Sequence, residues 1–358
     1  MSSFSALRAR ECFLLRSLER TAAIDDVLCS AQNRHFSAAL VRVERGGALV
    51  YERAFGATRL DAQAQPVYVD TRFDLASITK LFVSTVALEL VARGAVALDA
   101  PLRGVITEWT GTAHEPITLR MLLAHTSGMH SGADYRTLLD TQVADFALCR
   151  PLAAMPGERV IYSDLGMIAL GLAIERITRH SLADSMRRLW GAAVGFNPPA
   201  SERAAIPATE ADLWRGRVQG SVHDEKAHLM NGVAGHAGLF GSAAVVARLT
   251  EIYLAADRGR AQTLLSPPLA REAVACVADD PVLRRGLGWA LKTTGENSCG
   301  PLFGPRSFGH TGFTGTCIWA DPDRDLQAVL LTNAVYFGRE DSRPLRVAFY
   351  DAVIEAFG

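Results

Sequence analysis

The chain opens with a stretch whose apolar side chains recur at roughly helical spacing, over residues 6–31. This spacing predicts an amphipathic helix. Two runs rich in β-forming residues follow at 36–43 and 48–55, and Glu44-Arg45-Gly46-Gly47 between them is typical of a hairpin turn. The first part of the chain is therefore predicted to form a helix and a β-hairpin.

The middle of the chain has mainly helical patterns. Residues 81–92 are apolar enough for a buried helix, and Gly94 is placed to end it. A short helix is expected at 117–125, and between about 135 and 275 helical segments dominate, of which 165–178 is the clearest. Loops rich in Gly and Pro separate these segments.

Strand patterns return after Gly286, at 287–292, 316–320 and 327–333, and a last helix is predicted at 344–356. Strands at both ends with helices between them imply one sheet built from the N- and C-terminal parts, with a helical region inserted. We therefore expect an α/β (α+β) protein that works as one unit. Its predicted parts are an α/β lobe of residues 1–73 and 285–358 and a mainly helical lobe of residues 74–284.

Composition narrows the class of protein. Apolar residues make up 49% of the chain and charged residues 21%, which is ordinary for a globular protein. Lys and Arg number 37 against 38 Asp and Glu, so no net field would attract nucleic acid or an anionic membrane. No apolar run reaches the length of a membrane span and the start shows no signal peptide, so we expect a cytoplasmic protein. The six cysteines lack Cys-x-x-Cys spacing, which argues against a zinc site.

Ser77 and Lys80 mark the start of the predicted buried helix. They are three residues apart, and because a helical turn takes about 3.6 residues their side chains share one face. Unpaired backbone N–H groups and the positive end of the helix dipole would favour an oxyanion near Ser77. Burial would push the pKa of Lys80 down, towards that of a base. Alone the pattern is weak evidence, since an N-cap Ser followed by a surface Lys has the same spacing.

Two later stretches offer partners for this serine. Residues 156–166 read as a turn, a short extended piece and a helix start, which would present Tyr162 on a loop with Asp164 as the helix N-cap. The alternative for Tyr162 is an aromatic residue packed under that helix. Residues 307–315 hold His310 among glycines that leave the backbone bare enough for a substrate to lie alongside as an added strand. The alternative for His310 is an ordinary strand residue.

Three motifs occur in a familiar order. Ser77-x-x-Lys80, Tyr162-x-Asp164 and His310-Thr311-Gly312 resemble those of the serine β-lactamase and DD-peptidase superfamily. The match is closest to the class C β-lactamase-like branch, which includes D-aminopeptidases and family VIII carboxylesterases. The resemblance covers about residues 35–355 and extends to the segments 122–129 and 232–240.

The resemblance implies a predominantly antiparallel sheet flanked by helices and an acyl-enzyme mechanism. Ser77 would attack a carbonyl while Lys80 and Tyr162 move its proton. The backbone N–H groups of Ser77 and Phe313 would form the oxyanion hole. The substrate would be a small-molecule ester, amide or β-lactam, with no cofactor and no metal. The predicted catalytic residues are Ser77, Lys80, Tyr162 and His310, and the predicted substrate-binding residues are Asp164, Thr311, Gly312 and Phe313.

Two residues depart from the family pattern. Asp164 replaces the more usual Asn, so a carboxylate stands where an amide would donate to a substrate carbonyl. His310 replaces the Lys of Lys-Thr-Gly and removes a permanent cation. Neutral esters lose nothing by this change, so we expect esterase activity to exceed activity on anionic β-lactams. Activity on anionic substrates should improve as the pH falls towards 6 and His310 is protonated.

Other functions stay open at this point. One is a penicillin-recognising or D-amino-acid peptide hydrolase, and another is a binding or sensor domain that does not turn over. A third is a metal-dependent hydrolase, but the candidate ligands lack the His-x-x-x-His spacing of a helical zinc site. These candidate ligands are His125, His130, His223, Asp224 and His228.

Overall fold

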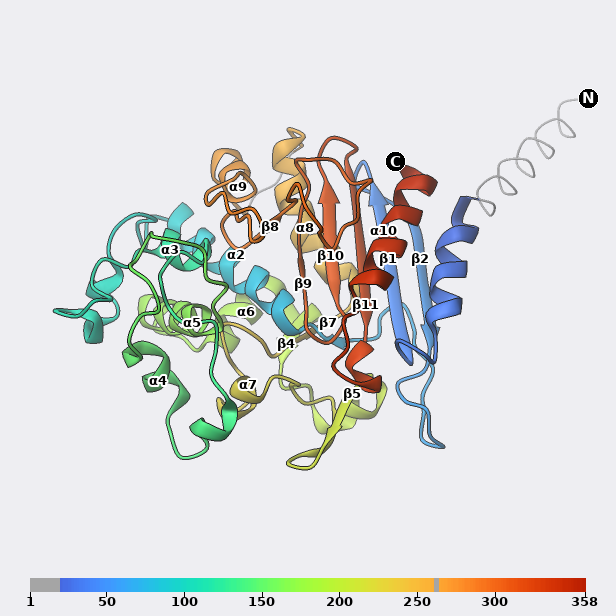
Figure 1. The fold of residues 1–358 in the computed structure, drawn as a ribbon, viewed down its shortest axis with the longest axis horizontal. Coiled ribbons are helices and arrows are strands. Elements are labelled where there is room, and N and C mark those ends of the chain that lie inside the picture. Colours follow the sequence, from blue (N-terminus) through green and yellow to red (C-terminus); the bar gives the residue numbers. More distant parts are fainter. Residues whose placement is uncertain (1–19, 261–263) are drawn as a thin grey trace, which may run out of the picture.

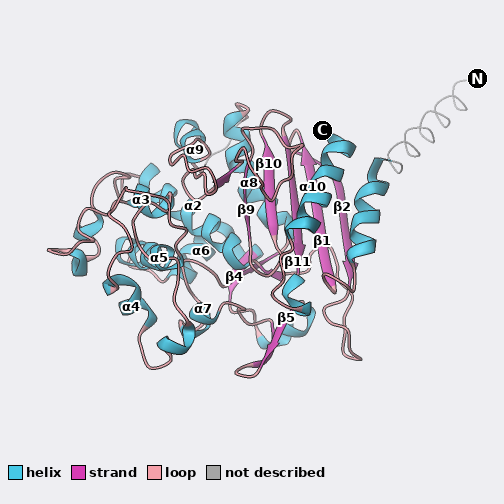
Figure 2. Ribbon diagram, viewed as in Figure 1, coloured by secondary structure: helices cyan, strands magenta, loops and turns pink. Residues whose placement is uncertain are grey.

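A six-stranded sheet forms one side of the molecule (Figures 1 and 2), in the strand order β2-β1-β11-β10-β9-β8. The computed structural model describes residues 20–260 and 264–358. Every neighbouring pair in this sheet is antiparallel, which confirms the expected architecture. The strands are β1 (Ala38–Arg45), β2 (Ala48–Gly56), β8 (Ala290–Leu291), β9 (Phe308–Thr311), β10 (Cys317–Asp321) and β11 (Leu326–Thr332).

Both ends of the chain contribute to this sheet. β1 pairs with β11 in a register that sets Leu40 opposite Leu331. The predicted hairpin joins β1 to β2, and Gly46 and Gly47 take φ values of 61° and 76° in its turn. Glycine adopts this left-handed conformation without the clash that a Cβ would cause, and so the turn follows from the sequence.

Alternate residues of β1 face two different cores. Leu40 packs into the large core shared with the helical region, while Val41 packs into a smaller core on the opposite face. Residues 20–31 are helical and cover that opposite face together with α10 (Arg343–Phe357). Residues 6–19 of the predicted first helix lie outside the described residues. α8 (Ala243–Asp257) packs on the other face, against β1 and β11.

α2 (Thr79–Ala92) runs through the interior between the sheet and the helical region (Figure 1). Its apolar sequence has no polar face, and all of its residues before Val91 are buried. The other helices are α3 (Leu119–Leu123), α4 (Val143–Cys149), α5 (Asp164–Thr178), α6 (Leu182–Trp190), α7 (Glu225–Leu229) and α9 (Pro267–Ala273).

Two small sheets interrupt the helical region, and neither was predicted. The strand order of the first is β3-β7-β4, and β5 and β6 form a separate hairpin. The two-lobe division of the chain stays a prediction, and α8, which lies within the predicted helical lobe, packs on the main sheet. The strands of the two small sheets are β3 (Phe73–Asp74), β4 (Val194–Phe196), β5 (Ala208–Asp212), β6 (Gly216–Gln219) and β7 (Leu239–Gly241).

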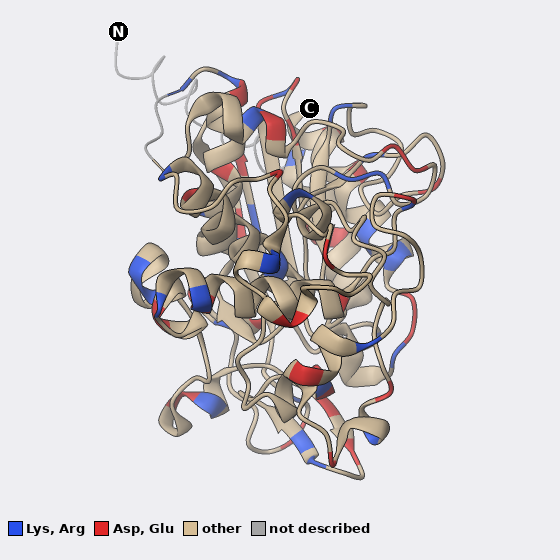
Figure 3. Ribbon diagram, turned by 90° about the vertical axis from the view of Figure 1, so that its left-hand side faces the viewer, with Lys and Arg blue, Asp and Glu red and all other residues tan. Residues whose placement is uncertain are grey.

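Charged residues of both signs are interspersed over the side of the molecule drawn in Figure 3. This agrees with the nearly balanced totals of acidic and basic residues. No helix within the described residues is long and apolar enough to cross a bilayer.

Candidate active site

Ser77 lies in a short 3₁₀ turn, Ala76–Ile78, that leads into α2. Ala76 has a φ of 46°, which is a strained conformation for a residue with a side chain. Asp74 holds this turn, because its buried carboxylate accepts hydrogen bonds from Ala76 N at 2.8 Å and His223 N at 2.6 Å. The turn that carries Ser77 is therefore fixed by a carboxylate that the sequence analysis did not identify.

The end of β9 packs directly against this turn. Thr316 Oγ1 donates a hydrogen bond to Leu75 O at 3.1 Å. A Cβ on Gly312 would lie 2.7 Å from Leu75 O and 2.1 Å from Thr316 Oγ1, so no larger residue fits without a shift. The glycine of the third motif is thus needed to bring the strand close to Ser77.

Lys80 is buried beside Ser77 and is held by three oxygen atoms. Its Nζ lies 2.9 Å from Ser77 Oγ, 2.9 Å from His236 O and 2.9 Å from Asp164 Oδ1. Burial lowers the pKa of Lys80, but Asp164 and Tyr162 raise it by more, and the pKa ends above its usual value. The prediction of a lowered pKa was therefore wrong, because it left out the carboxylate. Lys80 is an ammonium that donates to Ser77.

Asp164 is the first residue of α5 and is not its N-cap. Ser163 takes that position, and its Oγ accepts from Gly166 N at 2.8 Å. Burial raises the pKa of Asp164, but neighbouring cations, Lys80 first, lower it below its usual value. Lys226 Nζ also lies near this carboxylate, 3.4 Å from Oδ2. Asp164 thus pairs with Lys80 and does not line the cavity where we had expected it to meet substrate.

A network of charges extends behind Lys80. Asp224 pairs with Lys226 at 3.0 Å and with Nε2 of His236 at 2.7 Å. Asp164, Asp224 and His236 offer atoms within 4.8 Å of one another, which is close enough for metal ligands. Both carboxylates are already compensated by Lys80 and Lys226, so we assign the group as an ion-pair network. The sequence analysis identified neither Lys226 nor His236 as a partner in this network.

Tyr162 is placed by His125. Ile161 N donates to His125 O at 2.8 Å, and Ser163 N donates to His125 Nδ1 at 3.1 Å, so the backbone on both sides of Tyr162 is fixed. The two rings lie 4.7 Å apart. Burial, with the nearby cations, holds the pKa of His125 well below its usual value, and the imidazole is neutral. Lys80 Nζ lies 5.0 Å from the centre of the Tyr162 ring.

His310 is a buried residue of β9 and is also neutral. Its Nδ1 lies 2.8 Å from Thr311 O, which can only accept, so Nδ1 carries the proton. Burial, followed by the charges of Arg285 and Lys80, lowers the pKa of His310 to about 3. The expectation that His310 becomes protonated as the pH falls towards 6 is therefore wrong.

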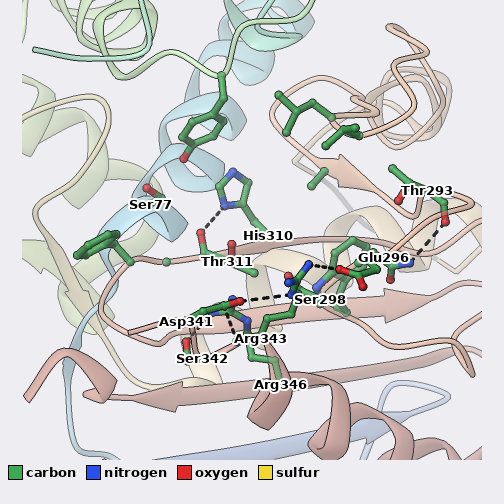
Figure 4. A pocket seen from close by; sticks show the side chains of 18 of the residues that line it. Ser77, Thr293, Glu296, Ser298, His310, Thr311, Asp341, Ser342, Arg343 and Arg346 are labelled. Atoms are coloured by element: carbon green, nitrogen blue, oxygen red, sulfur yellow. Dashed lines mark hydrogen bonds and ion pairs between the residues drawn. The ribbon is translucent and has the colours of Figure 1, made fainter. Parts of the chain in front are cut away.

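A cavity of about 650 Å³ opens beside Ser77 (Figure 4). Six of the eight predicted site residues line it, and Lys80 and Asp164 are not among its lining residues. The Phe313 side chain is 57% exposed and stacks on His223 with ring centres 5.6 Å apart. The six predicted residues that line the cavity are Ser77, Tyr162, His310, Thr311, Gly312 and Phe313. The lining also includes the charged residues Glu296, Asp341, Arg343 and Arg346.

The arrangement of Ser77 and Tyr162 at one cavity, with Lys80 buried beside Ser77, can be compared with known proteins. The model of the Beta-lactamase family matches residues 22–352. The chain belongs to the beta-lactamase family. The resemblance predicted from the three motifs is confirmed, and with it membership of a family of serine hydrolases.

Individual relatives of this beta-lactamase family member have different activities. Esterase EstB of Burkholderia gladioli is 30% identical, over 95% of this chain and 97% of that protein. N-acetylmuramyl-L-alanine amidase of Bacillus subtilis is 28% identical, over 83% of this chain and 77% of that protein. The solved structure of EstCE1, a hydrolase with promiscuous acyltransferase activity, has a TM-score of 0.77 at 20% identity, over 95% of this chain and all of that one. This structural likeness supports the fold.

Proposed function

We propose that the chain hydrolyses small carboxylic esters through an acyl-enzyme on Ser77. One observation carries the proposal: the Lys80 ammonium, itself paired with Asp164, lies 2.9 Å from Ser77 Oγ at the wall of the cavity. A hydroxyl that receives a charge-assisted hydrogen bond is stabilised as it loses its proton.

Acylation needs a proton acceptor other than Lys80, since Asp164 keeps Lys80 protonated. Tyr162, as a tyrosinate, is the acceptor in this proposal and lines the same cavity as Ser77. The Ser77 proton passes to the Tyr162 oxygen while Oγ bonds to the carbonyl carbon. Backbone N–H groups of Ser77 and Phe313 hold the oxyanion. The alkoxide then leaves and takes the proton from Tyr162.

Deacylation repeats these steps with water. Water gives a proton to Tyr162 and attacks the acyl carbon, and the bond to Ser77 Oγ breaks. The proton returns to Ser77 as the acid leaves. Each group ends the cycle in its starting state, and so the proposal needs no cofactor.

Two observations favour esters. The neutral His310 adds no charge that would bind an anionic substrate. The match to EstB spans almost the whole of both chains, whereas the match to the amidase spans 77% of that protein. The amidase relative makes amide hydrolysis the second candidate, with the same residues acting on a poorer leaving group.

The test compares kcat/KM for a neutral short-chain aryl ester, the matched aryl amide and a chromogenic cephalosporin. We expect many turnovers of the ester at the highest kcat/KM, unaffected by a chelator. Ser77→Ala should lower turnover by several orders of magnitude, and Ser201→Ala, at an exposed serine, is the matched control. Higher kcat/KM for the amide would favour the second candidate, and a single burst would indicate a binding or sensor domain.

A further inference from the structure

Arg285 is a buried cation at the wall of the cavity, and within the described residues its charge is opposed by Asp280 through space, without a direct ion pair. Arg285 is 6% exposed, and its Nε and Nη1 are buried without a hydrogen-bond partner. Within residues 20–260 and 264–358, no carboxylate forms an ion pair with it. Burial of a guanidinium without a direct ion pair is strongly unfavourable, so this position needs an explanation.

The backbone fixes Arg285 on both sides. Arg285 N donates to Ala278 O at 2.9 Å, and its carbonyl accepts from Val277 N at 2.9 Å. The next residue, Gly286, lies so close to Ala273 that a Cβ would come within 2.2 Å of Ala273 O. The backbone that carries Arg285 is thus tied to the segment 273–278.

The guanidinium lies over the Tyr162 ring. Its Cζ is 5.1 Å from the ring centre, and Lys80 Nζ is 5.0 Å from the same point. The charge of Lys80 is compensated by Asp164 at 2.9 Å, whereas Arg285 has no direct ion pair and is opposed only by the more distant charge of Asp280. Tyr162 therefore has one surplus positive charge beside it.

We propose that Arg285 is a positioning residue that stabilises Tyr162 in the negatively charged form in which it accepts the Ser77 proton. Arg285 thus supplies, beside Tyr162, the positive charge that the neutral His310 does not supply. This inference rests on the proposed function, because it requires Tyr162 to be the proton acceptor.

The other groups that face Tyr162 leave this role to Arg285. His125, which follows α3, and His310 on β9 are both neutral. Lys80 on α2 and Asp164 on α5 cancel each other. Removal of Arg285 would leave the tyrosinate without a net positive neighbour among these groups.

A role in binding a substrate carboxylate fits the geometry less well. Nε and Nη1 of Arg285 have almost no accessible surface, so although Arg285 lines the cavity, a ligand there could reach only its Nη2. The guanidinium carbon lies over the Tyr162 ring instead. A cation in this position is attracted electrostatically by the aromatic ring.

Arg285→Met removes the charge and keeps a long side chain. We expect kcat/KM for a neutral ester to fall about 100-fold, mostly in kcat. The acid side of the pH–rate profile should move up by about one to two pH units, because the tyrosinate loses a nearby cation. The thermal midpoint should stay equal or rise, since an unpaired buried charge is gone. Arg285→Lys, which keeps the charge, should have a kcat/KM about tenfold above that of Arg285→Met.

Arg248→Met is the matched control, because Arg248 also lies over an aromatic ring, 5.4 Å from the centre of Trp190, and does not line this cavity. It should leave kcat/KM within about threefold. In a Tyr162→Phe background, adding Arg285→Met should lower kcat/KM by less than about a further threefold, since both changes remove the same function.

Three results would overturn the inference. They are losses of kcat/KM that multiply in the double variant, an effect of Arg285→Met confined to the KM of an anionic ester, or an acid side of the pH–rate profile that does not move in Arg285→Met. The last two would point to substrate binding and to packing, respectively. Failure of the proposed function is distinguishable, because Ser77→Ala would then retain turnover.

Discussion

The pairing of Asp164 with Lys80 gives the strongest quantitative prediction, through the change Asp164→Asn. The carboxylate oxygen lies 2.9 Å from Nζ, and at an effective dielectric constant of about 20 two unit charges at this distance attract by about 6 kcal/mol. Desolvation offsets part of this, and breaking a buried pair costs about 3–5 kcal/mol. The Asn amide oxygen can still accept from Lys80. We therefore expect a loss near the lower end, about 3 kcal/mol in the free energy of unfolding.

The pH dependence of this loss follows from two pKa directions. The pKa of Asp164 is lowered, so its contribution is present above the usual value of 3.8 and is lost as the pH falls through the lower folded value. The pKa of Lys80 is raised, so its contribution is present below 10.5 and is lost only at higher pH. The difference between wild type and Asp164→Asn should be constant from about pH 5 to 9 and shrink below about pH 4.

The same change should affect turnover. Without the carboxylate, burial lowers the pKa of Lys80 with less opposition, and the hydrogen bond from its ammonium to Ser77 weakens as the pH rises. We expect kcat/KM for a neutral ester to fall about 10- to 100-fold at pH 8 and less at pH 6.

Urea unfolding and ester kinetics across this pH range provide the assay. Asp99→Asn is the control, because Asp99 pairs with Arg120 at 2.6 Å but is 67% exposed, and such a pair contributes less than about 1 kcal/mol. If Asp164→Asn is no less stable than Asp99→Asn and equally active at pH 6 and 8, the carboxylate does not hold Lys80 charged.

Three further predictions concern residues at the cavity wall and Lys80 behind it. Tyr162→Phe and Lys80→Ala should each lower kcat/KM by about 10²- to 10⁴-fold. The double variant should lose little more than either single variant, and ester kinetics in which the two losses multiply would show that the residues act separately. Gly312→Ala should cost about tenfold or more in kcat/KM, since its Cβ would lie 2.7 Å from Leu75 O; full activity would contradict this packing. His310→Lys should raise kcat/KM for an anionic ester about 10- to 150-fold relative to a neutral one. Wild type should show no such gain between pH 8 and 6, because the pKa of His310 is about 3.

Local signals in the sequence predicted much of the fold. The glycine turn between β1 and β2 and the uniformly apolar α2 are specified by neighbouring residues, and both were predicted. The two-residue β3 and the three-residue β7 were not, because such short strands depend on pairing between distant segments.

The sequence indicated which residues lie around Ser77 better than it indicated their charges, and their roles stay a prediction. Ser77, Tyr162 and His310 line one cavity, as the motif order implied. The pKa direction of Lys80 was missed because it depends on how α5 packs against α2, which decides where the Asp164 carboxylate lies. Arg285 lies far from Tyr162 in the sequence and belongs to no motif, so only the folded chain reveals it.

In the proposed function, Ser77 is the nucleophile that forms the acyl-enzyme. The most direct test is to incubate the protein with a neutral aryl phosphonate ester, which traps an activated serine, and to locate the adduct by mass spectrometry of peptides. We predict a single phosphonyl adduct on Ser77, absent from Ser77→Ala and retained in Ser201→Ala. An adduct on another residue, or unchanged labelling of Ser77→Ala, would contradict the account.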